Sequence, residues 1–139
     1  MISRVLVPVA ASEMADRAVR YALEAHPDAE IVALHVVGEP SAMMGKAVGL
    51  ALEDDIQQAA EEHASTVHQR ARDIAEQYDA EISTAVAWGD PTKEIVNRAV
   101  DFDTVIIGSH GGTLAERLFV GNVAQKVFRR SPVPVTVVR

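Results

Sequence analysis

The chain of 139 residues contains no cysteine, which excludes disulfide bonds, thiolate zinc sites and cysteine nucleophiles. It has no apolar run near the ~20 residues of a membrane-spanning helix, so we expect no membrane partner. The first residues lack the basic and apolar regions of a secretory signal, which makes the cytoplasm the expected location. Hydrophobic residues make up 48% and charged residues 24%, the balance of a globular protein. At this length we expect one domain, residues 1–139.

Basic residues are scarce: 13 stand against 20 acidic ones, for a net charge of −7. A nucleic-acid partner is therefore not expected, because binding the phosphate backbone needs a basic surface. The distribution is uneven. Residues 108–139 hold a single acid, Glu116, beside Arg117, Lys126, Arg129, Arg130 and Arg139. An anion is most favourably bound by this C-terminal part.

Several known site signatures are also missing. No Gly-Lys-Ser/Thr occurs, and no Gly-x-Gly-x-x-Gly follows the first apolar run, which argues against a Walker A loop and a dinucleotide site. That run ends in Val9-Ala10-Ala11, without the acids of a receiver domain or the hydroxyl-rich loop of a flavodoxin. A Gly-x-Ser-x-Gly hydrolase elbow is absent as well.

What the sequence does contain is a regular alternation of strand and helix patterns. Short apolar runs at 5–9, 31–37, 104–107 and 132–138 predict buried strands, and 81–88 predicts a strand with one wetter face. Helical spacing follows Ser12 and Asp90-Pro91, which we expect to cap their helices, and recurs over 56–78 and 122–129. Residues 38–50 are expected to be irregular. This order predicts an α/β protein with an open parallel five-stranded sheet and helices on both faces.

In such sheets, ligands bind outside the carboxyl ends of the strands, where the strand order reverses. The pattern Gly108-x-x-Gly111 follows a predicted strand, and Gly121-Asn122 opens the next helix, with Asn122 as the expected N-cap. Glycines allow close backbone approach, and a helix N-terminus suits phosphate. The sequence thus indicates a phosphate-binding loop, although Gly-x-x-Gly after a strand is commonly only a tight connection.

The histidines do not suggest a metal or catalytic centre. His35 lies in an apolar strand and is interpreted as a hydrogen-bonded core residue. His63 and His68 are five positions apart, which does not place them on one helix face, so we expect both to be solvated. Ser109 and His110 are too close in sequence to form a nucleophile–base pair. Trp88 is expected to pack. We therefore predict no metal site and no catalytic residues.

The chain resembles the universal stress protein family over essentially the whole of its 139 residues. The resemblance is carried by the segments 5–9 (VLVPV), 34–37 (LHVV), 89–91 (GDP), 103–111 (DTVIIGSHG) and 130–138 (RSPVPVTVV). It implies a Rossmann-like sheet in the order 3-2-1-4-5 and a homodimer. In that order the last strand is an edge, so we expect two copies to pair there, through Val133, Val135, Val137 and Val138.

One branch of that family binds ATP through Gly-x2-Gly-x9-Gly-Ser/Thr, and Gly108, Gly111 and Gly121 keep this frame. Two positions differ: Asn122 replaces Ser or Thr, and Ala10 stands where the family usually has an aspartate that would hold ribose or a metal-bound water. The resemblance implies a nucleotide site formed by Pro8, Val9, Ala10, Val36, Ile107, Gly108, Ser109, His110, Gly111, Gly121, Asn122 and Val123.

The resulting hypothesis is a regulatory protein that binds ATP, with or without Mg²⁺, or another adenine nucleotide in the loop after the fourth strand. Its downstream protein partner is not indicated by the sequence. The main alternative is a nucleotide-free dimeric signalling module, which Ala10 and Asn122 favour. A slow ATPase is a third hypothesis, although no positioned general base is evident.

Overall fold

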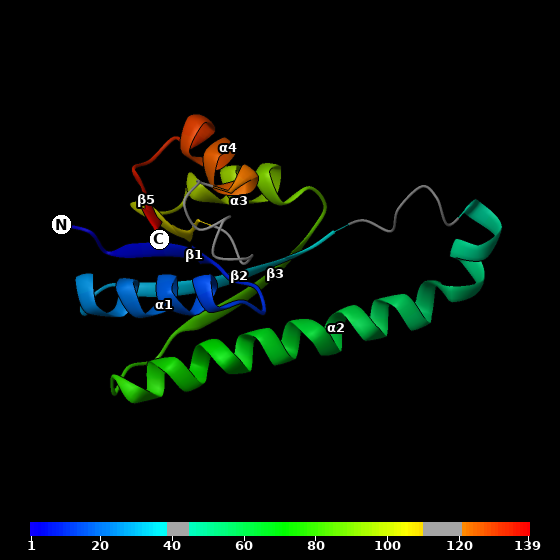
Figure 1. The fold of residues 1–139 in the computed structure, drawn as a ribbon, viewed down its shortest axis with the longest axis horizontal. Coiled ribbons are helices and arrows are strands. Elements are labelled where there is room, and N and C mark those ends of the chain that lie inside the picture. Colours follow the sequence, from blue (N-terminus) through cyan, green and yellow to red (C-terminus); the bar gives the residue numbers. More distant parts are fainter. Residues whose placement is uncertain (39–44, 110–120) are drawn as a thin grey trace.

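The computed structural model describes residues 1–38, 45–109 and 121–139, and the side chains of residues 45–54 are also outside this description. Strands and helices alternate along these residues, as predicted (Figure 1). The elements in chain order are β1 (Arg4–Pro8), α1 (Glu13–Ala25), β2 (Glu30–Val37), α2 (Gly45–Gln77), β3 (Ser83–Trp88), α3 (Pro91–Ala99), β4 (Thr104–Gly108), α4 (Asn122–Arg130) and β5 (Val135–Val138).

The strands form a five-stranded sheet in the order β3-β2-β1-β4-β5, and every neighbouring pair is parallel. This confirms both the predicted fold class and the expected strand order. β1 lies at the centre, where Val5, Leu6 and Val7 are completely buried. The chain runs outward from β1 to β3, then crosses to β4 on the other side of β1. The strand order therefore reverses between β1 and β4.

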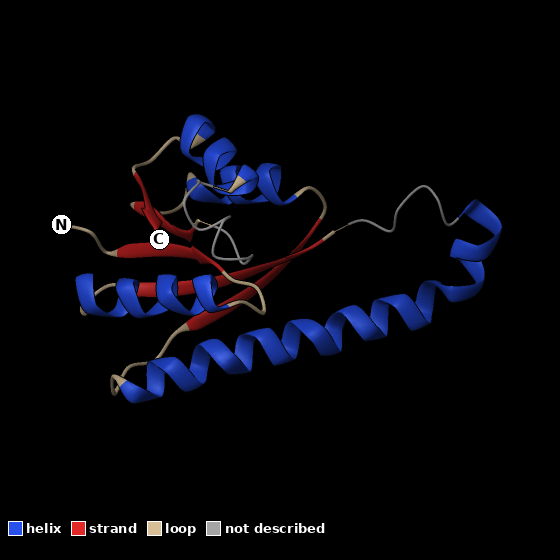
Figure 2. Ribbon diagram, viewed as in Figure 1, coloured by secondary structure: helices blue, strands red, loops and turns tan. Residues whose placement is uncertain are grey.

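Helices cover both faces of the sheet (Figure 2). α1 and α2 lie on one face and α3 and α4 on the other. Side chains alternate along a strand, so Val5 and Val7 pack in the core under α1 and α2, whereas Leu6 packs in the core under α3 and α4. Because burying an aliphatic side chain stabilises a fold by roughly 1.5–3 kcal/mol, these two cores hold the helices against the sheet.

The starts of the first and third helices agree with the sequence patterns. Ser12 caps α1 by accepting from the Ala15 N–H at 3.1 Å. Asp90 caps α3 by accepting from the Lys93 N–H at 3.1 Å, and proline follows at the first helical position. The prediction for α4 is wrong: Gly121 is the N-cap, and Asn122 is the first helical residue. Within the described part of the chain, no side chain caps this helix.

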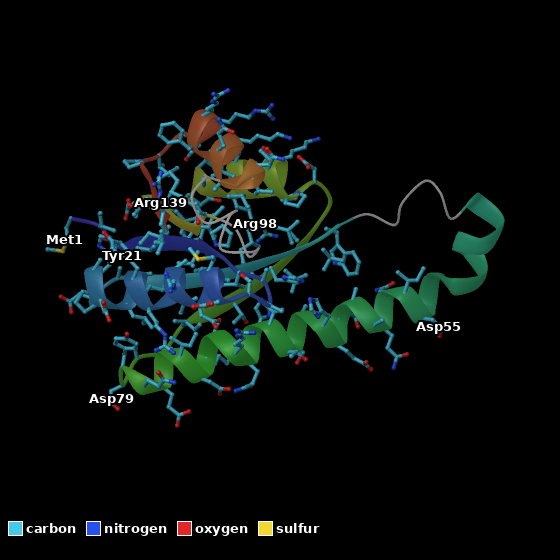
Figure 3. The ribbon with its side chains drawn as sticks, in the orientation of Figure 1. Met1, Tyr21, Asp55, Asp79, Arg98 and Arg139 are labelled. Atoms are coloured by element: carbon cyan, nitrogen blue, oxygen red, sulfur yellow. The ribbon has the colours of Figure 1, made fainter. Side chains whose placement is uncertain are left out.

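α2 begins earlier than predicted. Its 33 residues start at Gly45, so the irregular segment expected over 38–50 is wrong from that residue onward, and residues 39–44 lie outside the description. Two glycines cost a helix only about 1 kcal/mol each, and the alanines and leucines around them favour helix. Asp55 marks the part of α2 that extends past the sheet, and Asp79 lies beyond its opposite end (Figure 3).

The two outer strands differ in exposure and are shorter than predicted. β3 begins at Ser83, where pairing with β2 starts, and β5 begins at Val135, just after two prolines that cannot donate to a ladder. The expected wetter face of β3 is confirmed, since Val86 is 38% and Trp88 45% exposed. Trp88, which was expected to pack, lines a groove together with residues of α2 and is packed only in part.

Candidate functional site

A cavity of about 250 Å³ opens at the carboxyl end of the sheet, where the strand order reverses. This is the position that open parallel sheets use for ligands. Its walls come from β1 and the turn after it, from β2 and β4, and from three helices. The lining residues are Pro8, Val9, Ala10, Ser12, Met14, Ala15, Leu34, His35, Val36, Pro91, Ile95, Ile107, Gly108 and Val123.

The cavity walls are largely apolar, with Ser12 and His35 as the polar side chains among the lining residues. Backbone groups supply further polarity. Leu34 accepts from the Val9 N–H at 2.8 Å, which marks the side of β2 that faces β1. Because backbone groups alternate sides along a parallel strand, Val36 presents its N–H and C=O on that same side. Pairing of β1 with β2 ends at Pro8 and Leu34, so these Val36 groups face the cavity.

Three helices begin beside the cavity. Ser12 precedes α1, Pro91 opens α3, and Val123 lies in the first turn of α4, and all three residues line the cavity. A helix N-terminus carries partial positive charge from its free N–H groups. Asp90 satisfies one such group in α3, whereas none of the described side chains caps α4. The cavity is therefore an apolar pocket with partial positive charge on the side of the helix starts.

Gly108 has a packing role that its sequence context did not reveal. A Cβ atom at this position would lie 2.6 Å from the Met14 carbonyl oxygen, a distance that real Cβ atoms do not tolerate. The missing side chain lets β4 approach α1 closely. Gly108 also lines the cavity. The glycine is thus required by the fold whether or not a ligand contacts it.

The chain after β4 is held in place by backbone hydrogen bonds. Ser109 donates from its N–H to the Val138 carbonyl at 2.8 Å and accepts from the Gly121 N–H at 2.7 Å. These bonds bring the start of α4 beside the end of β4. The Ser109 side chain is buried, and its Oγ has no hydrogen-bond partner among the residues described. Asn122 is exposed at the start of α4.

The predicted nucleotide-site residues thus fall into three groups. Pro8, Val9, Ala10, Val36, Ile107, Gly108 and Val123 line the cavity. Ser109 directly follows β4, and Gly121 and Asn122 are the N-cap and first residue of α4; none of the three is among the lining residues. His110 and Gly111 lie outside the described residues.

The arrangement of the three histidines agrees with the prediction for His35 and His63 and differs from it for His68. His35 is buried, and its Nδ1 lies 3.1 Å from the Val9 carbonyl, which confirms a hydrogen-bonded core histidine. His68 was expected to be solvated, and this is wrong: it is 6% exposed, and its Nε2 lies 3.0 Å from the Ala85 carbonyl. Burial lowers the pKa of His68. His63 is exposed, as predicted.

The described residues hold no cluster of three or more histidine, cysteine or acidic side chains arranged to bind a metal ion. None of their helices combines the length and apolar character needed to cross a membrane.

Solved structures share this architecture. The chain is 28% identical to universal stress protein MJ0577 of Methanocaldococcus jannaschii over 156 residues, covering 100% of this chain and 96% of the relative. The solved structure of MJ0577 has a TM-score of 0.79 at 27% identity, covering 99% of this chain and 96% of that one.

Two further structures match the fold and hold nucleotides. A universal stress protein in complex with cAMP has a TM-score of 0.68 at 24% identity, covering 99% of this chain and 97% of that one. The universal stress protein of Archaeoglobus fulgidus in complex with dAMP has a TM-score of 0.64 at 19% identity, covering 100% and 98%. The sequence pattern of the universal stress protein family matches residues 1–139. This chain belongs to the universal stress protein family.

Proposed function

We propose that this protein binds an adenine nucleotide in the cavity at the carboxyl end of its sheet. The observation that carries the proposal is an apolar cavity at the strand-order reversal, faced by the free backbone of Val36. An apolar pocket with a few fixed polar groups is the usual form of a small-molecule site. That related folds hold cAMP and dAMP supports the same ligand class.

The adenine ring suits this cavity chemically. Its flat faces would contact apolar side chains such as Val9 and Ile107. Its edge carries an amino donor beside a ring-nitrogen acceptor, and the Val36 C=O and N–H are the complementary pair. The volume of about 250 Å³ lies just below the range of roughly 300–1,000 Å³ that ligand pockets occupy. It accommodates the nucleoside, and the phosphates extend out of it.

The phosphates would lie toward the start of α4, where Gly121, Asn122 and Val123 present the first turn of an uncapped helix. Ala10, which lines the cavity just after β1, offers no carboxylate to a metal ion. A Mg²⁺ ion accompanying ATP would therefore bind mainly to phosphate oxygens, so we expect ATP affinity to depend only weakly on Mg²⁺.

Isothermal titration calorimetry with ATP, ADP, AMP and cAMP, each with and without Mg²⁺, tests the proposal. Saturable binding of at least one of them is the expected result. Native mass spectrometry of freshly purified protein adds a second readout, since a bound nucleotide appears as a fixed mass increment. Absence of heat at millimolar concentrations of all four ligands would reject adenine nucleotides as the ligand class.

A pair of α4 variants tests the location of the site. Val123 lines the cavity, and Gln125 is exposed two positions further along the same helix without lining it. Val123→Asp places a negative charge beside the phosphates and should abolish ATP binding. Gln125→Asp adds the same charge outside the cavity and should retain it. Both aspartates lie near the N-terminus of α4, where an acidic side chain stabilises a helix, so neither substitution should unfold it through its charge.

We also propose that two copies pair through β5, the edge strand next to β4. Val133, Val135, Val137 and Val138 are each partly buried within a single chain and pack against its two cores. Their remaining exposed surface, together with the free edge of β5, is what a second copy would cover. An apolar edge strand pairs readily with another strand unless something blocks it.

A nucleotide-free signalling module is the second candidate function. The observation that favours it is Ala10, because no acidic side chain stands among the cavity's lining residues to bind ribose hydroxyls. A dimer by sedimentation, together with no bound nucleotide by mass spectrometry and no heat with any of the four ligands, would support this alternative.

A further inference from the structure

Three histidines gather between α2 and the sheet, and we call them the histidine cluster: His35 on β2, with His63 and His68 on α2. The ring centroid of His35 lies 5.4 Å from that of His63 and 6.4 Å from that of His68, both in edge-on arrangements. His35 and His68 are 8% and 6% exposed, whereas His63 is exposed. Two buried imidazoles in one packed interface form an unusual concentration of titratable groups.

Hydrogen bonds fix the tautomers of the two buried rings. A carbonyl oxygen only accepts, so the ring nitrogen that faces one must carry the proton. His35 therefore donates from Nδ1 to Val9, and His68 donates from Nε2 to Ala85. In the neutral rings, His35 Nε2 and His68 Nδ1 are left with lone pairs. Protonating either nitrogen adds a charge and a new donor inside the interface.

The positive charge of Arg72 opposes the protonation of His68. From α2, Arg72 acts electrostatically on His68 and donates to Thr84 on β3 at 3.0 Å. Glu61, also on α2, lines the same surface groove as His68 and accepts from Gln57 at 3.2 Å. β2 contributes only His35 itself, and β3 faces His68 with the uncharged residues Thr84, Ala85, Val86 and Trp88. On the α1 side, Asp16 is paired with Arg70 at 2.6 Å.

The cluster is directly connected to the cavity. His35 and Val9 both line the cavity wall, and His35 Nδ1 donates a hydrogen bond to the Val9 carbonyl oxygen. Val9 also donates to Leu34, so it is anchored to β2 from both its N–H and its C=O. A displacement of His35 would therefore shift the wall of the cavity.

We propose that His35 is a positioning residue for the nucleotide site, and that protonation of His68 separates α2 from β2 and weakens nucleotide binding. A neutral His68 ring keeps the interface between α2 and β2 closed. When His68 takes up a proton in acid, its positive charge lies beside Arg72 and against the His35 ring, and the wall formed by Val9 and His35 moves. The nucleotide part of this inference rests on the proposed function, whereas the coupling between the cluster and Val9 does not.

The first experiment measures that coupling without any ligand. NMR titration from about pH 8 to about pH 5 follows the His68 ring protons and the Val9 amide, across the range in which histidine changes charge. The Val9 amide signal should shift with the same midpoint as His68, and the shift should disappear in His68→Gln. Glutamine keeps an N–H donor for Ala85 but does not titrate. A Val9 amide signal that does not change while His68 titrates would overturn the proposal.

Two further variants sharpen the measurement. His26→Gln removes a histidine at the C-terminal end of α1, outside the cluster, and should leave the Val9 titration unchanged. Arg72→Gln removes the neighbouring positive charge, so His68 should protonate more readily and the shared midpoint should move to higher pH. Equal effects of His26→Gln and His68→Gln would show that the response is not specific to the cluster, contrary to the proposal.

The second experiment measures ATP affinity by calorimetry at about pH 8 and about pH 5. ATP itself takes up a proton in this range, so each variant is compared with the wild type at each pH. From about pH 8 to about pH 5, the ATP affinity of the wild type should fall by a factor roughly fivefold larger, or more, than that of His68→Gln. A difference of this size is expected for coupled sites. Equal losses in both proteins would contradict the coupling to binding. If no ATP binds at either pH while Val9 follows His68, the proposed function fails and the coupling stands.

Discussion

Arg98 on α3 covers part of the outer edge of β3: its Nη2 donates to the Val86 carbonyl oxygen at 3.3 Å. From the opposite face of the sheet, Arg72 on α2 donates to the Thr84 hydroxyl. Two cationic side chains therefore converge on this edge, one from each helical layer, and Figure 3 labels Arg98. Charged side chains at an edge discourage pairing with a further strand. β5 itself, Val-Thr-Val-Val, carries no charged side chain.

This asymmetry predicts which edge forms the dimer. Pro134 and Val138 accept from β4, so the backbone groups of Val135 and Val137 face outward. Val137→Pro removes an outward N–H without breaking the pairing with β4, and proline is tolerated at such edge positions. We expect this variant to sediment as a folded monomer, whereas the wild type sediments as a dimer.

The matched control lies on the opposite edge. Val86 also directs its backbone outward, so Val86→Pro removes an equivalent N–H from β3. This variant should remain dimeric. Loss of the dimer in Val86→Pro together with its retention in Val137→Pro would place the interface on β3.

Gly108 provides a test of packing that needs no ligand. In Gly108→Ala the new Cβ meets the Met14 carbonyl at 2.6 Å, and the backbone of α1 must shift to make room. Such overpacking costs roughly 1–3 kcal/mol of unfolding free energy. Gly38 is the control, since a Cβ there has nothing within 4 Å. Urea denaturation of Gly38→Ala should show little change. Equal stability of the two variants would contradict the packing role of Gly108.

These examples show what the sequence can and cannot reveal about the fold. The strands, the order of elements and the caps at Ser12 and Asp90 follow from local patterns, since apolar periodicity and capping act within a few residues. The fit of Gly108 against Met14 depends on two segments that are distant in sequence. A glycine after a strand has the same local appearance whether it serves a ligand or a neighbouring helix.

The candidate site shows the same division. The end of β1 and the end of β4 could be named as site segments because parallel sheets place their carboxyl ends together. The burial of His68 was not predicted, because its spacing from His63 describes only positions on the helix and not what the helix packs against. Its burial results from packing against β3, which is distant in sequence. A sequence signal was nevertheless present, because His68 directly follows Val67, an apolar residue within the helical spacing over 56–78.

Asp103 joins the N-terminal residues to the turn before β4. Its carboxylate accepts from the N–H groups of Ser3 and Arg4 at 2.7 and 2.9 Å. These two bonds lower the pKa of Asp103 below its ordinary value of 3.8. A lowered pKa means that the stabilisation is present above that ordinary value and is lost as pH falls through the folded-state pKa.

Asp103→Asn should therefore lower the thermal unfolding temperature at neutral pH, with the difference from wild type shrinking in strong acid. Asp101→Asn, two positions earlier on the same exposed turn, is the control and should have a smaller effect. A difference between Asp103→Asn and wild type that persists unchanged below the Asp103 pKa would assign the effect to something other than the charge.

His68 predicts that the stability of the protein decreases as pH falls below 6.5. Burial is the main cause that lowers its pKa below 6.5, with His35 and Arg72 adding repulsion and the bond to Ala85 acting in the opposite direction. The unfolded chain consequently binds a proton at a higher pH than the folded protein does. The free energy of unfolding should thus be constant with respect to this group above pH 6.5 and decrease as pH falls toward the folded-state pKa. Urea denaturation across this range should show a steeper decrease in wild type than in His68→Gln, since glutamine takes up no proton in either state. Parallel curves for the two proteins would mean that His68 titrates alike in the folded and unfolded chains, which its burial against Ala85 does not allow.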